Sequence, residues 1–309
     1  MAKDIEVKEL LDAGVHFGHL THRWNPNMAP YIYMERNGIH IINLYKSAAK
    51  MQEAAKAMSK IAASGRKILF VATKKQAKEI VAEEAEKCNM PYITERWPGG
   101  MLTNFVTIRK SVKKMDWVDR MKKDGRFDSL SKREQLQINR MRAKLEKQLG
   151  SISEMNRLPG ALFVVDILRE HIAVKEAQRL SIPVFAMVDT NSDPRQVDYV
   201  IPSNDDASKS IKKVVSYVSD AVVGGLDVRE KELEAKRKEK AEAKAKKEKA
   251  KKEKAKKEAD AKAAEEKKAK AEKKEASTEK KEASTEKKAD KPTEGKKAES
   301  AAKAEKKED

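Results

Sequence analysis

Three histidines near the start of the chain share a regular spacing. His16, His19 and His22 recur every three residues, and imidazoles placed in this way could bind a zinc ion. Gly14 and Gly18 lie among them, and no cysteine or glutamate stands nearby to complete a ligand set. Imidazoles that pack in the fold or contact nucleic acid explain the cluster with fewer assumptions, so zinc is the minor interpretation.

Two aspartates are better placed for a metal ion. Asp189 closes a predicted strand at 183–189, and Asp205 follows another at 199–202. Neighbouring parallel strands end at one edge of a sheet, where two carboxylates could hold Mg²⁺. The alternative is that Asp205 caps a helix and Asp189 shapes a turn. The sequence therefore requires no cofactor and offers one candidate site for a divalent cation.

Two predicted strand ends carry groups that suit phosphate. Lys74 and Lys75 begin a helix after the first strand of the sheet, where free backbone N–H groups add to their charge. Arg96 leaves the second strand and precedes Gly99 and Gly100, which allow close approach of the backbone. The alternative for Lys74 and Lys75 is a plain pair of solvated side chains. The alternative for the segment after Arg96 is a tight turn around a buried Trp97.

The motifs of nucleotide-dependent and hydrolytic enzymes are missing. The chain reads Val-Ala-Thr-Lys-Lys-Gln at 71–76, with neither a Gly-x-Gly-x-x-Gly turn nor a Gly-Lys-Ser/Thr phosphate loop. A Gly-x-Ser-x-Gly elbow is absent as well. The single cysteine, Cys88, excludes an internal disulfide and a multi-cysteine zinc ribbon. We therefore expect no catalytic activity and no small-molecule substrate.

The elements that would position these residues follow from the hydrophobic pattern. Short aliphatic runs predict strands, and amphipathic segments between them predict helices. Continuous apolar strands that alternate with helices indicate a doubly wound α/β fold with a five-stranded parallel sheet. Upstream, we expect helices at 5–13 and 46–63 around a β-hairpin with an Asn37-Gly38 turn. The predicted strands of the sheet lie at 67–73, 91–94, 161–166, 183–189 and 199–202, and the helices at 75–87, 170–180 and 203–223, with Gly224-Gly225 ending the last one.

Residues 105–150 interrupt this alternation. Apolar residues at helical spacing in both halves predict a helical hairpin, and Ser131 with Glu134 forms a capping box for its second helix. The hairpin holds 14 basic and 6 acidic residues. A solvated helix face is the alternative, but charge of one sign favours a polyanionic partner. Its first candidate contacts are Arg109, Lys110, Lys113 and Lys114.

Composition divides the chain into two parts. The net charge is +18, and residues 229–309 carry half of it while containing almost only Lys, Glu, Ala, Ser and Thr. Such a tail cannot build a core and is expected to be disordered or helical, which leaves one α/β domain at 1–228. The chain has no signal-peptide pattern and no apolar run of about 18 residues. We therefore expect a cytoplasmic protein without membrane association.

Several long motifs resemble those of a known family. These motifs are Gly14-Val-His-Phe-Gly-His19, His40-Ile-Ile-Asn-Leu44, Arg96-Trp97 with Gly99 to Asn104, and Val188 to Pro194 through Ile201 to Asp206. They resemble small-subunit ribosomal protein two, the universal uS-two family, over about residues 3–224. The tail is longer than most members of that family carry.

The resemblance implies a fold and a place of action. Members have a flavodoxin-like sheet with an inserted coiled-coil hairpin, and they bind 16S ribosomal RNA between the head and body of the small subunit. The family also contacts neighbouring ribosomal proteins and helps to dock protein one, the mRNA-binding protein. Phosphate contacts should dominate, because the 15 aromatic residues mostly occupy core-like or motif positions. The expected RNA contacts are Arg23, Lys74, Lys75, Arg96, Arg109, Lys110, Lys113 and Lys114.

Two rival functions make different predictions. A nucleotide-dependent enzyme at the strand edge should be stabilised by ATP, NAD or flavin mononucleotide, and we expect no such thermal shift. A free, chromatin-like DNA binder should lose its nucleic-acid binding when the chain is cut near residue 228. A ribosomal protein should keep that binding in its folded part.

Overall fold

A computed structural model describes residues 5–238 and residue 240. The chain divides into two compact units, Met1–Lys236 and Arg237–Asp309, where the sequence placed the boundary after residue 228. The expectation of a disordered or helical tail falls, from residue 241 on, outside the described residues.

A five-stranded parallel sheet forms the centre of this unit. Its strands are β4 (Ile68–Val71), β5 (Tyr92–Ile93), β6 (Ala161–Val165), β7 (Val184–Val188) and β8 (Tyr199–Pro202). Their order in the sheet is β5-β4-β6-β7-β8, and every neighbouring pair is parallel. Residues of β4, β6 and β7 are all buried, because continuous apolar strands must be covered on both faces. The predicted doubly wound α/β fold is therefore confirmed.

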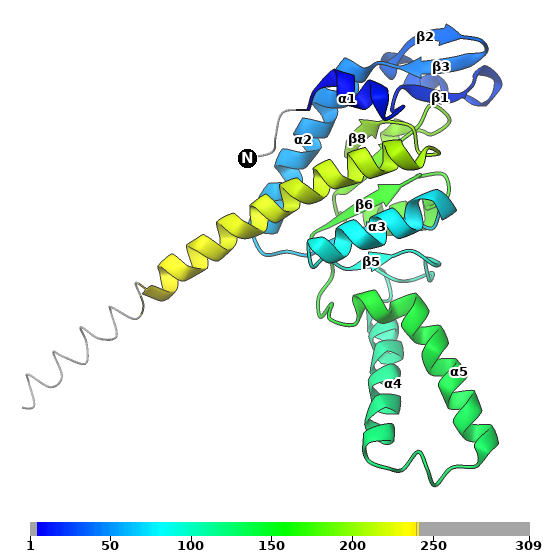
Figure 1. The fold of residues 1–309 in the computed structure, drawn as a ribbon, viewed down its shortest axis with the longest axis vertical. Coiled ribbons are helices and arrows are strands. Elements are labelled where there is room, and N and C mark those ends of the chain that lie inside the picture. The colour runs from blue at the N-terminus through cyan, green and yellow to red at the C-terminus, as the bar shows by residue number, and fades with distance from the viewer. Residues whose placement is uncertain (1–4, 239, 241–309) are drawn as a thin grey trace, which may run out of the picture. The chain divides into compact units, whose positions relative to one another are not determined.

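Helices cover the two faces of the sheet and create two cores (Figure 1). Side chains alternate along a strand, so Phe70 of β4 joins one core and its neighbour Leu69 the other. The first core includes apolar residues of α2 (Leu44–Ala63), α3 (Lys75–Lys87) and a last helix at 208–238. The second includes residues of α6 (His171–Arg179) and of the segment before the hairpin. None of the described helices is both long and apolar enough to cross a membrane.

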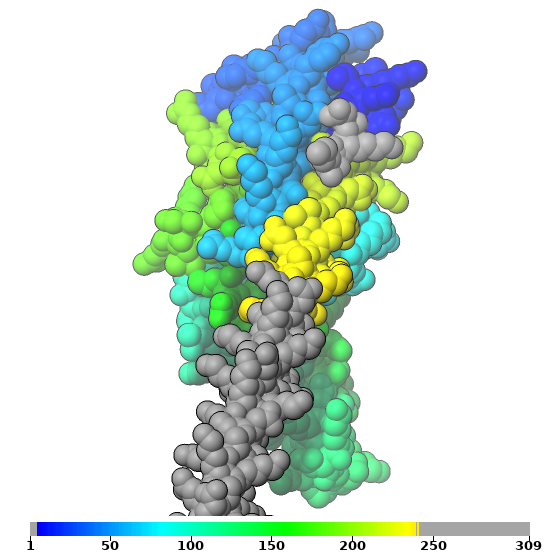
Figure 2. Space-filling view, turned by 90° about the vertical axis from the view of Figure 1, so that its left-hand side faces the viewer, coloured from blue at the N-terminus to red at the C-terminus, as the bar shows by residue number. Residues whose placement is uncertain are grey.

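The last helix runs past the two glycines that were expected to end it. Neither Gly224 nor Gly225 adopts the positive φ of a glycine that terminates a helix, so that prediction is wrong. A Cβ on Gly225 would lie 2.4 Å from the carbonyl oxygen of Ser59 in α2. Gly225 therefore serves close packing of two helices, and Figure 2 shows the last helix, in yellow, beside α2, in blue.

A smaller antiparallel sheet precedes the parallel one in sequence. Its strands are β1 (Phe17–Leu20), β2 (Ile32–Arg36) and β3 (Ile39–Ile42), in the order β1-β3-β2. The helix α1 (Val7–Asp12) precedes β1, and two short 3₁₀ turns, Thr21–Arg23 and Pro26–Tyr31, connect β1 to β2. Asn37 and Gly38 both have positive φ, as a two-residue β-hairpin turn requires, so the predicted hairpin is confirmed. β1 could not be predicted from the sequence, because its Phe-Gly-His-Leu segment lacks a clear alternation.

The inserted hairpin consists of α4 (Phe105–Lys123) and α5 (Lys132–Leu149). Ser131 and Glu134 form the predicted capping box at the start of α5. An ion pair between Asp119 and Arg142 joins the two helices, while buried residues such as Val112 attach the base of the hairpin to the second core. In Figure 1 the hairpin projects beyond β5, and the small sheet lies near β8 at the opposite edge.

Candidate functional site

The carboxyl-terminal edge of the parallel sheet gathers four aspartates, here called the aspartate cluster. Asp166 follows β6, Asp189 follows β7, and Asp205 and Asp206 follow β8. Asp189 and Asp205 are almost completely buried, at 0% and 1% exposure. The structure brings these two predicted residues together at one edge, because neighbouring parallel strands end there. A metal ion bound between them stays a prediction.

The ammonium group of Lys74 lies inside the aspartate cluster. Its Nζ is 2.7 Å from Asp205 Oδ1, 2.6 Å from Asp206 Oδ1 and 3.6 Å from Asp166 Oδ2. Burial opposes the charge of Lys74, but the neighbouring carboxylates outweigh burial and raise the pKa of the ammonium group. The expectation that Lys74 contacts phosphate is therefore corrected, because its side chain is buried and its charge is already paired.

His19 contacts two members of the cluster from β1. Its Nδ1 lies 3.0 Å from Asp189 Oδ2, and its Nε2 lies 3.4 Å from Asp206 Oδ2. The hydrogen bond to Asp189, together with the charges of the cluster, raises the pKa of His19 against the effect of burial. The spacing of the histidines could not reveal this contact, since the two partners of His19 lie about 170 and 187 residues further along the chain.

The three histidines do not converge on one point. The ring of His16 instead packs against Phe17, with centroids 4.0 Å apart, and burial lowers the pKa of His16. His22 is exposed. In the described part of the chain, the side chains that could hold a metal ion are His19, Asp205 and Asp206, whose ligand atoms lie within 4.8 Å of one another. The zinc site suggested by histidine spacing is therefore not formed.

Asp205 is the most perturbed acid of the cluster. Burial, and then the charges of Asp189 and Asp166, raise the pKa of Asp205 to about 7, although Lys74 opposes this shift. Its Oδ2 atom is buried without a hydrogen-bond partner among the described residues. The cluster thus carries more negative charge than Lys74 neutralises, and a second cation would relieve the excess.

Most of the other predicted phosphate contacts are exposed. Lys75 and Arg96 follow the adjacent strands β4 and β5, and Arg23 lies in the Thr21–Arg23 turn. Lys110, Lys113 and Lys114 are exposed on α4. Arg109 is half-buried and donates a hydrogen bond from Nη1 to the carbonyl oxygen of Met155, at 3.1 Å. Arg109 therefore helps to anchor the hairpin as well as adding to its charge.

A buried glutamate holds the loop that follows Arg96. Glu176 of α6 accepts hydrogen bonds from the indole of Trp97 and from the backbone N–H groups of Gly100, Leu102 and Thr103. These bonds lower the pKa of Glu176 despite its burial. Trp97 is buried while Arg96 stays exposed, so the tight-turn and phosphate-facing interpretations of this segment are compatible. No local signal in the sequence linked Glu176 to the loop.

β1 and the residues that follow it cover the carboxyl-terminal end of β7. His19 N–H donates to Thr190 Oγ1 at 2.8 Å, and Asn25 N–H donates to the Thr190 carbonyl oxygen at 2.7 Å. A Cβ on Gly18 would lie 2.6 Å from the Thr190 methyl group. Gly18 therefore lets β1 pack directly against the end of β7.

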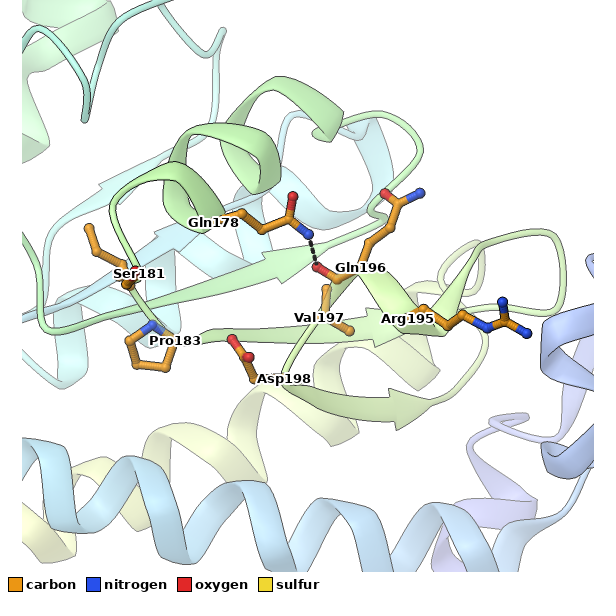
Figure 3. A pocket seen from close by; sticks show the side chains of 8 residues that line it. Gln178, Ser181, Pro183, Arg195, Gln196, Val197 and Asp198 are labelled. Atoms are coloured by element: carbon orange, nitrogen blue, oxygen red, sulfur yellow. Dashed lines mark hydrogen bonds between the residues drawn. The ribbon is translucent and has the colours of Figure 1, made fainter.

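A polar cavity lies at the opposite, amino-terminal ends of β7 and β8 (Figure 3). Its volume is about 380 Å³, and Pro183 and Asp198 stand among the residues that line it. The amide of Gln178 donates to the carbonyl oxygen of Gln196 at 2.8 Å, and Asp198 accepts from the N–H of Val184 at 2.9 Å. These two hydrogen bonds hold the loop before β8 against α6 and β7.

Known proteins that resemble this chain share one description. A family model described as "Ribosomal protein S2" matches residues 10–225. A protein of Christiangramia forsetii named "Small ribosomal subunit protein uS2" is 78% identical over 247 residues, which cover 80% of this chain and 83% of the relative. A protein with the same name from Flavobacterium johnsoniae is 76% identical over 76% of this chain and 93% of its own length. Another, from Parabacteroides distasonis, is 61% identical over 79% of this chain and 91% of its own length.

Proposed function

Because the chain belongs to the ribosomal protein S2 family, and is thus a ribosome-bound, non-enzymatic protein of the small subunit that acts in translation, we propose that its helical hairpin binds 16S ribosomal RNA. We place this contact between the head and body of the subunit, in the cytoplasm. The observation that carries the proposal is the uncompensated positive charge of α4.

The charge of α4 is free to meet phosphate. Lys110, Lys113 and Lys114 are exposed, and none of them forms an ion pair with another described residue. By contrast, Arg142 on the neighbouring helix is paired with Asp119 and Glu146. Phosphate neutralisation by such unpaired lysines supplies most of the sequence-independent affinity of proteins for nucleic acid.

Two further places can extend this contact. Lys75 and Arg96 lie at the ends of adjacent strands, and the loop after Arg96 leads directly into α4. The backbone N–H groups at the start of α3 add to the charge of Lys75, because no side chain caps that helix. Arg23 is exposed in a separate turn, Thr21–Arg23. Among the proposed contacts it lies furthest from the hairpin in sequence.

Reversal of the three α4 lysines tests the proposal. Lys110→Glu, Lys113→Glu and Lys114→Glu together should weaken binding to small subunits depleted of this protein, and should reduce the dependence of log affinity on log salt by roughly three. Arg109 is left intact, because its loss would also disturb the base of the hairpin. The matched control reverses three exposed lysines elsewhere, Lys56, Lys60 and Lys212. Equal effects of both triple variants would refute the proposal.

We further propose that the small antiparallel sheet takes part in docking ribosomal protein one. Large apolar side chains are exposed along this part of the chain, including Phe17 at 50%, Tyr33 at 70% and Met34 at 47%. Apolar side chains exposed on both outer strands of a small sheet, as here on β1 and β2, can mark a contact with another protein. Phe17→Ser with Tyr33→Ser should release protein one from assembled subunits while this chain remains bound, and retention of protein one would refute the idea.

We also propose that the aspartate cluster binds a divalent cation. The sequence suggested Mg²⁺, but the structure adds the imidazole of His19 to Asp205 and Asp206, and a nitrogen ligand favours Zn²⁺ or another transition metal. Elemental analysis of the purified chain should find this metal, and Asp189→Asn with Asp205→Asn should abolish it while the fold is retained. A metal-free wild-type protein would end the proposal.

A further inference from the structure

Trp117 is exposed on the outer face of α4. Its side chain is 54% exposed, whereas Trp97 is only 6% exposed. The inner face of the helix is supplied by Val112, Met115, Val118 and Met121, all of them buried. Trp117 is therefore not part of the packing between the hairpin helices, and a large aromatic surface is presented to the surroundings.

Cationic side chains surround this indole on the same helix face. Arg109 and Lys113 precede Trp117 by eight and four residues, and Arg120 follows it by three. These spacings place side chains on one side of an α-helix. Together with Val112 and Asp116, these residues line a hollow of about 350 Å³. Asp116 is the single acid there, so the hollow carries a net positive charge.

We propose that Trp117 stacks on an unpaired base of the ribosomal RNA, while Arg109, Lys113 and Arg120 bind the phosphates beside that base. The inference rests on the RNA-binding function proposed above and adds the mode of recognition. It also departs from the expectation that base stacking contributes little. A paired base offers no free face, whereas unpaired bases of loops and bulges are commonly bound by stacking on aromatic side chains.

A protein partner fits these residues less well. The buried centre of a protein–protein interface is depleted of charged residues, and lysine in particular is under-represented there. Here three cations flank one aromatic ring, a combination typical of single-stranded nucleic-acid sites, in which basic side chains follow the backbone and an aromatic ring receives the base. Charge complementarity thus selects RNA as the occupant.

Three substitutions at one position separate stacking from simple apolar contact. Trp117→Phe keeps an aromatic face, Trp117→Leu keeps apolar volume without one, and Trp117→Ala removes both. Affinity is measured for small subunits depleted of this protein, using the full chain. Ala and Leu should each weaken binding roughly 5- to 150-fold, the range expected for one stacked base, and Phe should retain most of the affinity. The melting temperature should stay the same for all three, because Trp117 is exposed.

Chemical probing identifies the occupant. In subunits that carry the Trp117→Ala chain, acylation of 2′-hydroxyl groups should increase at one or a few neighbouring nucleotides of 16S RNA and nowhere else. Leu binding as tightly as Phe, with unchanged RNA reactivity, would show an apolar protein contact and overturn the proposal. Full affinity of all three variants would overturn it as well.

The outcome is distinguishable from failure of the proposed function. If the triple lysine reversal weakens binding but no Trp117 substitution does, the hairpin binds RNA without this stacked base. If the lysine reversal has no effect while Trp117→Ala loses affinity and exposes nucleotides, the stacked base stands, but neither the lysine-dominated contact proposed for α4 nor the phosphate contact of Lys113 does.

Discussion

The hairpin and the carboxyl-terminal edge of the parallel sheet use positive charge in opposite ways. On α4, Lys110, Lys113 and Lys114 remain in solvent without ion-pair partners among the described residues. At the sheet edge, Lys74 is buried between Asp205 and Asp206. The positive charge on α4 is available to a polyanion, whereas the charge of Lys74 is neutralised by carboxylates within the fold. Lysines that look alike in sequence therefore differ in whether their charge stays free for a partner.

Removal of Lys74 should have the largest effect. Lys74→Met leaves the buried carboxylate of Asp205 beside Asp166 without their cation, which should lower the free energy of unfolding by about 3 kcal/mol at pH 8. Lys110→Met, the matched control on the hairpin, should change it by less than about 0.5 kcal/mol. Urea unfolding of both variants measures the difference. Similar values for the two would show that charge is used alike in both regions.

The pH dependence of stability should identify Asp205 next. In the folded chain Asp205 keeps its proton up to a pKa of about 7, whereas an unfolded aspartate releases it near pH ~3.9. The folded state therefore binds more protons between these values, and the contribution of Asp205 to stability falls as the pH rises from about 4 to 7. Asp205→Asn removes this loss, so from pH 5 to pH 8 the variant should gain about 2–3 kcal/mol relative to the wild type.

Asp206 supplies the control for that experiment. Burial opposes the ionised form of Asp206, but the hydrogen bond and charge of Lys74 outweigh burial and lower the pKa of this carboxyl group. Its contribution to stability is present above the usual aspartate pKa and is lost only in more acidic solution. Asp206→Asn should therefore show no gain between pH 5 and pH 8. A parallel trend in both variants would assign the effect to His19 or to another group.

The capping box of the hairpin should have a smaller and more local effect. Ser131→Ala removes the hydroxyl that caps α5 and should weaken the first turn of this helix by about 1 kcal/mol. Because the hairpin tip makes few contacts with the two cores, its local opening should be separate from global unfolding. Hydrogen exchange should speed up at residues 132–136 while the strands of the sheet keep their protection. Faster exchange in β6 would show that the hairpin and sheet unfold together.

Deletion of residues 241–309 should have the smallest effect. This segment is rich in lysine and has a net positive charge, so its attraction to ribosomal RNA is screened by salt. Binding of the truncated chain to depleted subunits should be modestly weaker at low salt and nearly unchanged at high salt. The cut is placed after residue 240, because the last helix is continuous through residue 238. Loss of incorporation at every salt concentration would make the tail a specific docking element.

Much of the fold could be predicted because it is encoded by neighbouring residues. The predicted helix at 75–87 coincides with α3, and the Asn37-Gly38 turn and the Ser131 capping box are both present. Each depends on residues within a few positions of one another. The last helix was predicted too short, since Gly225 signals a helix end in sequence but serves contact with α2 in the structure.

The sequence by itself determined the alternation of strands and helices, the inserted hairpin and the excess of positive charge. Only the tertiary structure decided which charges remain available. Lys74 and Asp205 are 131 residues apart, and Glu176 reaches a loop more than 70 residues before it. Such contacts depend on the order of strands in the sheet, which local periodicity does not specify. For this reason the sequence could not show that Lys74 is buried and paired, whereas the position of the α4 lysines on an exposed helix follows from local spacing.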